Sequence, residues 1–483
     1  MPVEEERMLK MKSYEKLYIN GEWREGRSAS VLENRNPYTD EVLYTYRAAS
    51  TADVDDAYEA AKAAQPSWAA LQPRERQEYL MRLYEVMVKH KDDILSVLRE
   101  EGGSTVVKAE AEYQFIVDVA RNSITFPLQM NGRIMPSNNH QENYVFRQAK
   151  GVISVIAPWN FPFDLSICAV IPAIATGNTV VLKPATDTPA SAALISQLFD
   201  EAGFPKGVMN YLAGKGSEIG DYFVTHPLSD FVYFTGSTAV GRHIAGLASQ
   251  EIKGISLELG GNNAMLVLGD ADIAKAVNVG ITSAYFNQGQ VCMSLNRIIV
   301  VKEKYDAFVE AFTESVKHIP YGDPADPKVL VGPSINGGQA ESVMNLMEET
   351  VKAGAKAAVR GERHGNVISP WLLVDCINDM PACRQEIFGP AVCVIRAEDE
   401  EEAIAIANDT EYGLSNNIIT EDVYHGLEVA RRIHTGMSHV NSPSVQDEAH
   451  VMFGSVKQSG LGRTNGEWAI EKFTEERWIS VNH

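Results

Sequence analysis

The chain has 483 residues with 43 basic and 64 acidic side chains, so its formal net charge is −21. Hydrophobic residues make up 45% and charged residues 22%, which excludes a disordered, collagen-like or coiled-coil chain and provides for an ample core. The length predicts about three structural units. An acidic surface repels phosphate, so we expect neither nucleic acid nor an anionic membrane as a partner.

The cysteines and the N-terminal segment predict a cytoplasmic location. The chain has five cysteines, an odd number with no CxxC pair, which favours free thiols in a reducing compartment. Residues 1–12 are rich in charged side chains and lack the apolar stretch of a signal peptide. The longest apolar stretch, 151–177, contains Asn160, Asp164 and several Pro and Gly residues, so we expect no membrane span there.

Residues 51–101 carry helical patterns. Ser50 or Thr51 can cap a helix with apolar residues on one face, and a second amphipathic run begins at Pro73. Gly102-Gly103 ends this helical region.

From residue 151 onward, short apolar runs alternate with helical patterns. This alternation predicts βαβ units, parallel sheets and an α/β fold with two α/β domains. The expected strands are 151–157, 179–183, 207–212, 230–234, 264–268, 297–301 and 391–397. Residues 126–148 are polar and predict a hairpin with its turn at Asn131-Gly132.

Several familiar catalytic motifs are absent. The sequence has no HExxH zinc motif, no GxSxG, no P-loop and no complete GxGxxG, and we expect no metal site. A glycine-containing turn does follow the expected strand 230–234, at Thr235 to Gly241. Free N–H groups at such a turn can bind an anion or a dinucleotide, and an ordinary βα loop is the equal alternative.

Four polar residues have contexts that favour chemistry. Cys292 lies in a polar, glycine-bearing loop where a thiolate can be reached, whereas Cys168 and Cys393 are typical buried small hydrophobes. Glu258 lies between leucines, where burial would raise its pKa toward that of a general base; a solvent-facing strand residue is the alternative.

The other two residues follow expected strands. Asn160 can donate to an oxyanion or satisfy its own turn. Lys183 ends a strand at the carboxyl edge of the sheet, where cofactors bind in such folds.

The order of the motifs along the chain points to one family. In sequence order they are PWNFP, VVLKPA, FTGSTAVG, LELGG, GQVC, EIFGP, YGLS and FGSVKQSGLGR. This set resembles the aldehyde dehydrogenase superfamily from about Leu17 to the end of the chain. NQGQVCMS is similar to the branch that oxidises benzaldehyde, vanillin and salicylaldehyde.

The resemblance implies three units and an oligomer. They are a Rossmann-like NAD(P)-binding domain (1–125 and 149–257), an α/β catalytic domain (258–455) and a small β oligomerisation arm (126–148 and 465–483). In this family each arm adds a strand to a neighbour, which implies a homodimer or homotetramer.

The resemblance also assigns roles to the residues singled out above. Cys292 would attack the aldehyde, Asn160 and the Cys292 N–H would hold the oxyanion, and Glu258 would activate the hydrolytic water. The resemblance also places Lys183 in this catalytic set, where it would form a hydrogen bond to the adenosine ribose. The implied cofactor-binding residues are Trp159, Lys183, Thr186, Gly236, Ser237, Gly241, Leu259, Glu386 and Phe388.

One departure from the family pattern concerns the cofactor. Many NAD-specific members carry Glu where this chain has Thr186, and that Glu repels a 2′-phosphate. We therefore expect NAD as the main cofactor with NADP also accepted. Ala239, Ser455, Ser415 and Asn417 also vary the family pattern without removing a catalytic group.

The expected substrate is a small aromatic aldehyde, oxidised to the carboxylic acid. Aromatic residues flank the reactive motifs, although some of them are general features of the family. The expected pocket residues are Phe161, Cys168, Phe286, Met293 and Phe453, with Tyr285 a further flanking aromatic. The alternatives are an aliphatic or semialdehyde dehydrogenase, a CoA-acylating dehydrogenase, or an oligomeric binding protein without catalytic activity. The presence of Glu258 disfavours the CoA-acylating enzyme. The retained catalytic residues disfavour the inactive binding protein.

Overall fold

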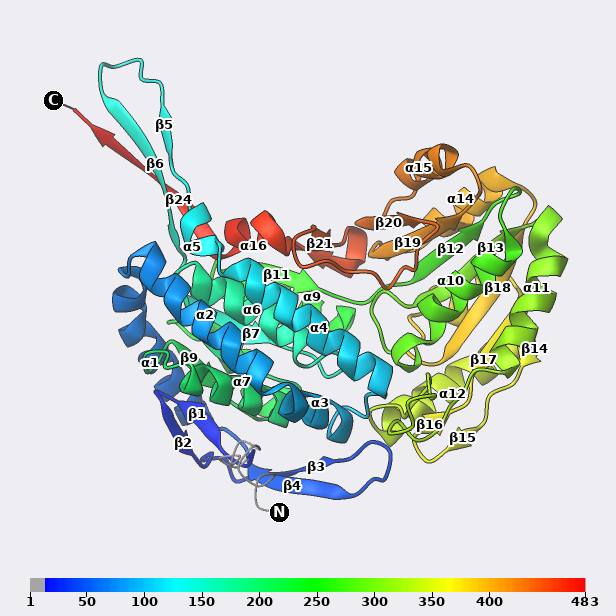
Figure 1. Ribbon diagram of the computed structural model, residues 1–483, viewed down its shortest axis with the longest axis horizontal. Helices are drawn as coiled ribbons and strands as arrows, with labels where there is room; N and C mark the ends of the chain where they lie inside the picture. The colour runs from blue at the N-terminus through cyan, green and yellow to red at the C-terminus, as the bar shows by residue number, and fades with distance from the viewer. Residues whose placement is uncertain (1–13, 483) are drawn as a thin grey trace.

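The computed structural model describes residues 14–482, which form two α/β lobes and a projecting β arm (Figure 1). The first lobe holds an eight-stranded sheet in the order β2-β1-β9-β8-β7-β10-β11-β22, and the second a seven-stranded sheet in the order β14-β17-β18-β13-β12-β19-β20. The α/β fold class with two α/β units is confirmed.

The predicted N-terminal helical region is present as three helices. They are α1 (Thr51–Ala69), α2 (Pro73–Lys89) and α3 (Lys91–Glu100). Ser50 is the N-cap of α1: its side chain accepts from the Asp53 N–H, while the Asp53 carboxylate accepts from the Ser50 N–H at 2.8 Å. This capping box satisfies two donors that the helix start would leave free.

The five central strands of the first sheet are parallel. They are β7 (Val152–Ile156), β8 (Thr179–Lys183), β9 (Met209–Tyr211), β10 (Phe231–Thr235) and β11 (Gly254–Glu258), with antiparallel β1 (Leu17–Ile19) and β22 (Gly460–Leu461) beside them. Lys183, Thr235 and Glu258 end their strands, so they lie along the same carboxyl edge.

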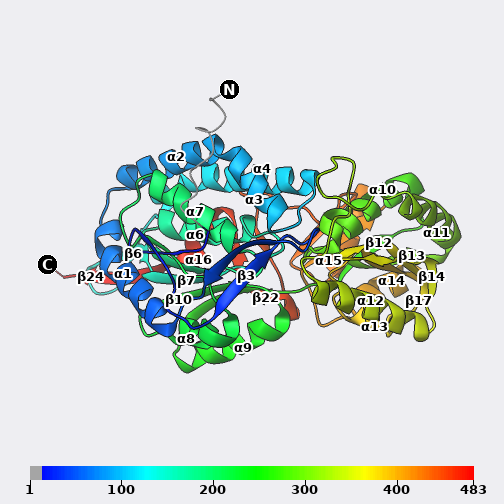
Figure 2. The same ribbon diagram turned by 90° about the horizontal axis from the view of Figure 1, so that it is seen from below.

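Helices cover both faces of this sheet, as Figure 2 shows. α6 (Asp164–Ala175) and α7 (Pro189–Glu201) pack on one face, and α8 (Asp221–Thr225) and α9 (Thr238–Gln250) on the other. Burial on both faces explains why these strands read as continuous apolar runs rather than as alternating patterns.

The second lobe repeats this plan. Its parallel strands are β17 (Trp371–Cys376), β18 (Ala391–Ala397), β13 (Leu295–Val301), β12 (Asn263–Val267), β19 (Ser415–Ile419) and β20 (Met437–Val440). Antiparallel β14 (Lys356–Val359) forms one edge. Among the covering helices are α10 (Ile273–Tyr285), α11 (Lys302–Lys317), α12 (Gly337–Lys352) and α14 (Glu400–Asn408).

The arm joins two distant segments of the chain. β5 (Arg133–Met135) and β6 (Glu142–Ala149) form the predicted hairpin, and the C-terminal strand β24 (Thr474–Val481) pairs with β6 from Thr474 to Val481 (Figure 1). The hairpin turn lies at 136–141, so the prediction that placed it at Asn131-Gly132 is wrong. That Asn-Gly pair lies between α5 (Phe126–Gln129) and β5 and leads the chain into the arm.

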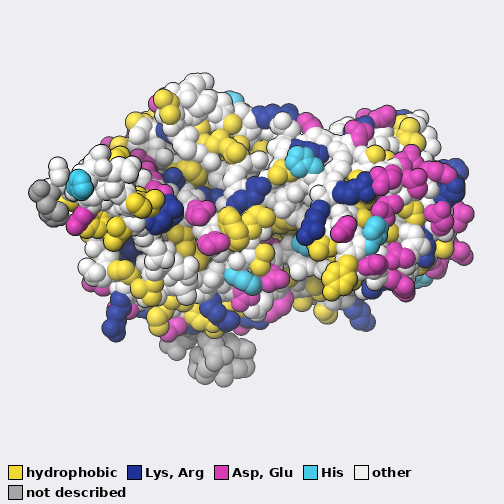
Figure 3. Space-filling view, turned by 90° about the horizontal axis from the view of Figure 1, so that it is seen from above, with side chains coloured by type: hydrophobic (Ala, Val, Ile, Leu, Met, Phe, Trp, Pro, Cys, Tyr) yellow, Lys and Arg dark blue, Asp and Glu magenta, His cyan; other side chains and the backbone are white. Residues whose placement is uncertain are grey.

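The surface is acidic, as the net charge requires. Figure 3 shows acidic side chains gathered at the end of the molecule that the second lobe forms. In the part of the chain from residue 14 to residue 482, no helix is long and apolar enough for a bilayer crossing.

Candidate active site

The candidate catalytic residues surround the point where the chain passes from one lobe to the other. Glu258 is the last residue of β11, and β12 of the second lobe begins at Asn263. Cys292 follows α10 and a short turn, η2 (Phe286–Gly289), in which Asn287 and Gln288 have φ of 51° and 47°. These left-handed conformations turn the loop back toward the first lobe.

Cys292 is partly exposed, unlike the other four cysteines. Its carbonyl accepts from the Asn263 side-chain amide at 2.8 Å, and the same amide donates to the Ser294 carbonyl, which fixes the loop around the thiol. Burial, and then the carboxyl groups of Glu386 and Glu258, raise the pKa of the Cys292 thiol well above its usual value. The resting residue is therefore a thiol that must lose its proton before it can act as a nucleophile.

Asn160 lies beside Cys292 with its side-chain amide anchored. One Nδ2 hydrogen bond goes to the Gln290 carbonyl at 3.1 Å, and the Asn287 amide donates to the Asn160 carbonyl at 3.3 Å. An amide nitrogen carries two hydrogens, so one remains for an oxyanion.

Glu258 is only 4% exposed, and neither of its carboxyl oxygens has a hydrogen-bond partner among the residues that the structure describes. Burial raises its pKa to about 7, and the charges of Lys472 and Arg463 oppose that rise. A carboxyl group with this pKa changes its protonation near neutrality, as a general base requires.

Two cavities meet at these residues. A cavity of about 390 Å³ and another of about 220 Å³ share four lining residues, Asn160, Leu165, Glu258 and Cys292. A thiol at such a junction can be approached by one molecule from each side.

The larger of these two cavities has features that fit a dinucleotide. The sequence-predicted residues that line it are Trp159, Gly236, Ser237, Leu259, Glu386 and Phe388. Ser237 caps the N-terminus of α9, whose free N–H groups favour an anion. The buried Thr235 hydroxyl, also in the lining, has no partner among the described residues.

Glu386 is held at the wall of this cavity. Its Oε1 accepts from the Gly261 N–H at 3.1 Å, and burial raises its pKa to about 7. A Cβ at Gly260 would come within 2.3 Å of Glu386 Oε2, so a larger residue there would displace the carboxyl group. Phe388 packs edge-on against Trp159 with ring centroids 5.3 Å apart.

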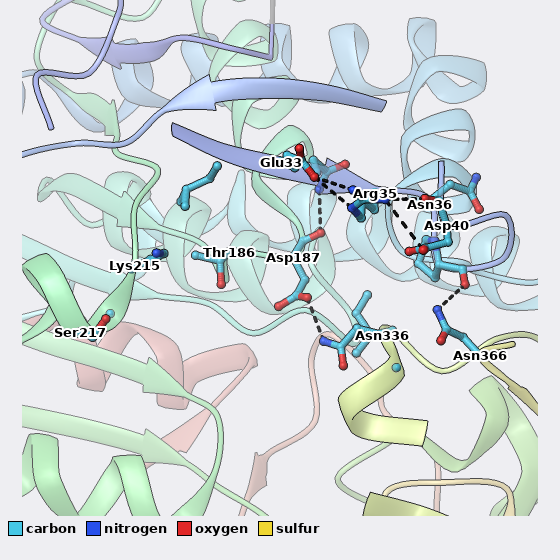
Figure 4. A pocket seen from close by; sticks show the side chains of 16 residues that line it. Glu33, Arg35, Asn36, Asp40, Thr186, Asp187, Lys215, Ser217, Asn336 and Asn366 are labelled. Carbon is cyan, nitrogen blue, oxygen red and sulfur yellow. Dashed lines mark hydrogen bonds and ion pairs between the residues drawn. The ribbon is translucent and has the colours of Figure 1, made fainter. Parts of the chain in front are cut away.

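Three predicted cofactor residues lie outside this cavity. Lys183 is buried with Nζ donating to the Pro184 carbonyl at 3.1 Å, and burial lowers its pKa to about 8. Gly241 lies in α9 rather than in the turn, where a Cβ would come within 2.4 Å of Leu259 Cδ2. Thr186 lines a separate polar cavity of about 500 Å³, next to Lys215 (Figure 4).

The smaller of the two meeting cavities has aromatic walls. All the predicted pocket residues line it, namely Phe161, Cys168, Phe286, Met293 and Phe453. The rings of Phe161 and Phe286 lie 6.4 Å apart. Tyr285, although adjacent in sequence, is fully buried and donates its hydroxyl hydrogen to the Trp371 carbonyl, so its expected contribution to the pocket is wrong.

Sequence reasoning missed several polar residues of this cavity, including Asp164, Asp447, Thr464 and Asn465. In the sequence Asp164 stands out as a charge inside an apolar stretch. The other three residues gave no signal, because the segments that carry them are remote in sequence from the motifs around Asn160 and Cys292. Lys472 was also missed: its Nζ is buried without a hydrogen-bond partner among the described residues and lies 4.6 Å above the Tyr233 ring.

The remaining cysteines are core residues. Cys376, Cys383 and Cys393 are buried in the second lobe with their sulfurs within 4.8 Å of one another. The reading of Cys393 as a buried small hydrophobe is confirmed. Cys168 is also buried, but it lies on the cavity wall and donates its thiol hydrogen to Asp164 Oδ1 at 2.9 Å.

A partly exposed thiol and a buried carboxyl group thus lie together at the junction of two cavities, between two α/β lobes, an arrangement suited to an enzyme active site. The chain belongs to the aldehyde dehydrogenase family, whose model matches residues 23–479. It is an aldehyde-oxidising oxidoreductase, and the family resemblance of its motifs is confirmed.

Individual relatives are similar over nearly their whole length. A vanillin dehydrogenase of Corynebacterium glutamicum is 46% identical over 467 residues, which cover 96% of each chain. The crystal structure of an NAD-dependent benzaldehyde dehydrogenase from Corynebacterium glutamicum is 43% identical with a TM-score of 0.91, covering 99% of this chain and 98% of that one. An NADP-dependent enzyme of Escherichia coli is 31% identical with a TM-score of 0.94, covering 98% of this chain and 100% of that one.

Proposed function

We propose that the protein oxidises small aromatic aldehydes to carboxylic acids, with NAD as its main hydride acceptor. The observation that carries the proposal is the position of Cys292 and Glu258 at the junction of two cavities, one reaching the N-terminus of α9 and the other with aromatic walls. Each cavity then supplies one reactant to the same thiol.

In the first half-reaction the Cys292 thiol passes its proton to a solvent water, and its sulfur then adds to the carbonyl carbon. The carbon–sulfur bond forms as the carbonyl π electrons move to oxygen, and the Asn160 amide and the Cys292 N–H stabilise that oxyanion. A bound nicotinamide dinucleotide supplies the hydride acceptor. After hydride loss, a thioester to Cys292 remains.

In the second half-reaction Glu258 takes a proton from water. The water oxygen attacks the thioester carbon, the carbon–sulfur bond breaks, and Cys292 leaves as the thiolate while the carboxylic acid departs. Because Glu258 is buried with a pKa of about 7, it can accept that proton at neutral pH.

The cofactor would lie with its phosphates near Ser237 at the start of α9 and its nicotinamide ribose near Glu386. Lys183 and Thr186 would hold the adenosine ribose. Thr186 carries no negative charge and lines the same cavity as Lys215 (Figure 4), which supports use of NADP as a second cofactor.

The aromatic substrate class rests on the cavity walls and on the names of similar enzymes. Aromatic rings stack edge-to-face with roughly 0.5–1.5 kcal/mol per pair beyond area burial, and a short aliphatic aldehyde gains none of this. The named relatives act on vanillin and benzaldehyde. An aliphatic or semialdehyde substrate remains the alternative, and Glu258 argues for hydrolysis rather than transfer to coenzyme A.

We also propose that the chain has the domain division expected above, lies in the cytosol and forms a homo-oligomer. The free cysteines support a reducing compartment. The open strand edges of the arm support assembly with neighbouring copies.

The test is a panel of aliphatic and aromatic aldehydes with NAD and with NADP, without and with coenzyme A. We expect the highest kcat/KM for a benzaldehyde with NAD, no dependence on coenzyme A, and a carboxylic acid as product. Cys292→Ala, the control, should lose turnover by on the order of 10³-fold or more while still binding cofactor. Preference for acetaldehyde, or turnover in the Cys292→Ala variant, would contradict the proposal.

A further inference from the structure

Three of the five cysteines come together inside the second lobe. Cys376 ends β17, Cys393 lies in β18, and Cys383 belongs to the short helix α13 (Pro381–Arg384) between these two strands in the chain. Each is at most 4% exposed, and the three sulfur atoms all lie within 4.8 Å of one another. Their spacing includes no CxxC pair, so the sequence alone predicted no metal site.

The convergence of three sulfurs fits a metal ion. A trigonal ion with metal–sulfur bonds of about 2.3 Å holds its sulfurs about 4.0 Å apart, so small side-chain movements would suffice to form such a site. Among residues 14–482, the group of ligand atoms includes no His, Asp or Glu. Thiolates select soft ions, and Cu(I) is satisfied by three sulfurs, whereas structural zinc takes four ligands.

A disulfide between the two strands fits less well. In the parallel pairing of β17 with β18, Cys376 lies opposite Ile395, whereas Cys393 lies opposite Leu373. The two cysteines are therefore offset by two residues along neighbouring strands, which places their Cα atoms roughly 8 Å apart. Cα atoms more than about 7 Å apart cannot be bridged without backbone movement.

A buried cation beside the cysteines complements the charge that a thiolate site would carry. Arg297 of β13 is fully buried and lies opposite Cys393 in the pairing of β13 with β18. Its guanidinium donates to the side chain of Asn378, which lies between Cys376 and Cys383 in the chain. Its other acceptors are main-chain carbonyls, so among the described residues no carboxylate accepts from it. Buried charges are normally paired, and three thiolates around Cu(I) would supply the negative charge.

We propose that Cys376, Cys383 and Cys393 form a binding site for a soft, thiophilic metal ion, with Cu(I) as the ion that fits three sulfur ligands. On binding, the three thiols release their protons to solvent, three copper–sulfur bonds form, and the copper keeps its oxidation state. The ion joins α13 to β17 and β18, and so fixes the segment that leads to Glu386. The proposal is independent of the proposed function, because the three cysteines line neither cavity at Cys292.

The test uses the Cys292→Ala protein, because Cys292 is partly exposed and would itself bind a soft ion. The folded protein is titrated anaerobically with Cu(I) against the chromophoric chelator bicinchoninate. It is also produced in copper-supplemented cells, because a buried site exchanges its ion slowly. We expect one Cu(I) per chain, and X-ray absorption should show three sulfur neighbours at about 2.3 Å. Failure to retain Cu(I) by either route, or coordination by fewer than three sulfurs, overturns the proposal.

Variants then assign the ion to the cluster. Cys383→Ala and Cys393→Ala, each combined with Cys292→Ala, should weaken Cu(I) binding by at least 10- to 100-fold, because a ligand is lost. Cys168→Ala, which removes a buried thiol of the first lobe, is the matched control and should leave Cu(I) binding unchanged. Unchanged binding in the first two variants, or an equal loss in all three, overturns the assignment. The X-ray absorption result does not depend on these variants, so it tests the site even where an alanine variant fails to fold.

A disulfide is the rival outcome. If hydrogen peroxide oxidises two thiols of the cluster to a disulfide and is itself reduced to water, while Cu(I) does not bind, the cluster is a redox pair and the metal assignment is wrong. A midpoint temperature of unfolding that rises with Cu(I) concentration supports the metal site, because an ion that binds only the folded chain stabilises it by mass action.

Discussion

Glu258 illustrates how the place of a residue in the fold changes its acid–base properties. The end of a buried strand removes its carboxyl group from water without providing a hydrogen-bond partner among the described residues, and its pKa rises to about 7. Its ionised fraction therefore increases as the pH rises through 7, and the rate of thioester hydrolysis should increase over the same range.

The first prediction concerns Glu258→Gln. The first turnover should still release a burst of reduced cofactor in rapid mixing, because the thiol and the oxyanion donors are intact. Steady-state turnover should fall by about 10²- to 10⁴-fold and lose its dependence on pH near 7. A variant with normal steady-state turnover would refute the role of Glu258 in hydrolysis.

A stability measurement on the same variant checks that it is folded and that the carboxyl group is buried. A group whose pKa is raised in the folded state stabilises the fold at low pH and loses that contribution as the pH rises through the folded value. Glu258→Gln should therefore match the wild type at acidic pH and exceed it at pH above 7, by roughly 3 kcal/mol in free energy of unfolding.

The second prediction concerns Thr186, the expected ribose contact. Thr186→Glu adds a negative charge beside Lys215 and should shift the NAD-to-NADP ratio of kcat/KM toward NAD by about 1–3 kcal/mol. Lys215→Met, which removes the adjacent positive charge, should reduce NADP use and leave NAD use nearly unchanged. Absence of NADP activity in the parent enzyme would contradict the reasoning.

At the scale of elements, the packing of α9 against Leu259 contributes to one wall of the cavity of about 390 Å³ that we propose for the cofactor. Gly241 permits close contact with Leu259, which lines that cavity just beyond β11. The sequence placed Gly241 in the turn before the helix, whereas the structure places it inside α9, where it allows close contact with Leu259. Sequence spacing does not distinguish these two roles, because a glycine with either role lies near the start of a helix that follows a strand.

The third prediction uses two glycines of α9. Gly241→Ala would bring a Cβ within 2.4 Å of Leu259 Cδ2, whereas a Cβ at exposed Gly246 meets nothing within 4 Å. Helix propensity favours alanine at both sites, so Gly246→Ala should stabilise the protein by roughly 0.5–1 kcal/mol. Gly241→Ala should destabilise it by about 1–3 kcal/mol and weaken cofactor binding, as measured by denaturant unfolding and titration with NAD. Equal effects at the two sites would rule out the packing explanation.

At the scale of the whole molecule, the arm is a thin sheet that projects from the two lobes with open edges and exposed apolar side chains. Its sheet has the order β24-β6-β5, so within residues 14–482 one edge of β24 and one of β5 have no neighbouring strand. Large apolar side chains are also exposed on it, with Ile134 at 77% and Trp478 at 65%. Unpaired edges and exposed apolar groups on a thin projection favour contact with another copy of the chain.

The fourth prediction tests this contact. Ile134→Lys should hardly change the stability of an isolated chain, because the side chain is already exposed. In the proposed interface, however, it places a charge. We expect light scattering to give a wild-type mass of two or four chains and a smaller mass for Ile134→Lys. Ile252→Lys, at a residue 93% exposed on the first lobe, should leave the mass unchanged. An identical mass for wild type and Ile134→Lys would refute a role of this residue in assembly.

The sequence by itself determined the α/β class, four of the five central strands of the first lobe, three of the six parallel strands of the second, and the motif around Cys292. Apolar runs and ordered motifs are local properties of the chain. The sequence did not reveal the pairing of β24 with β6, the packing of Gly241, or the meeting of Asp164 with Asp447 and Thr464 in one cavity. The pairing of β24 with β6 and the meeting of Asp164 with Asp447 join segments hundreds of residues apart, whereas Gly241 meets Leu259 only because a helix packs against the segment after a strand. In the sequence, a polar residue in a loop has the same signature whether it faces solvent or a cavity. Only the tertiary structure decided these features, because burial and proximity arise from packing the two lobes and the C-terminal segment together.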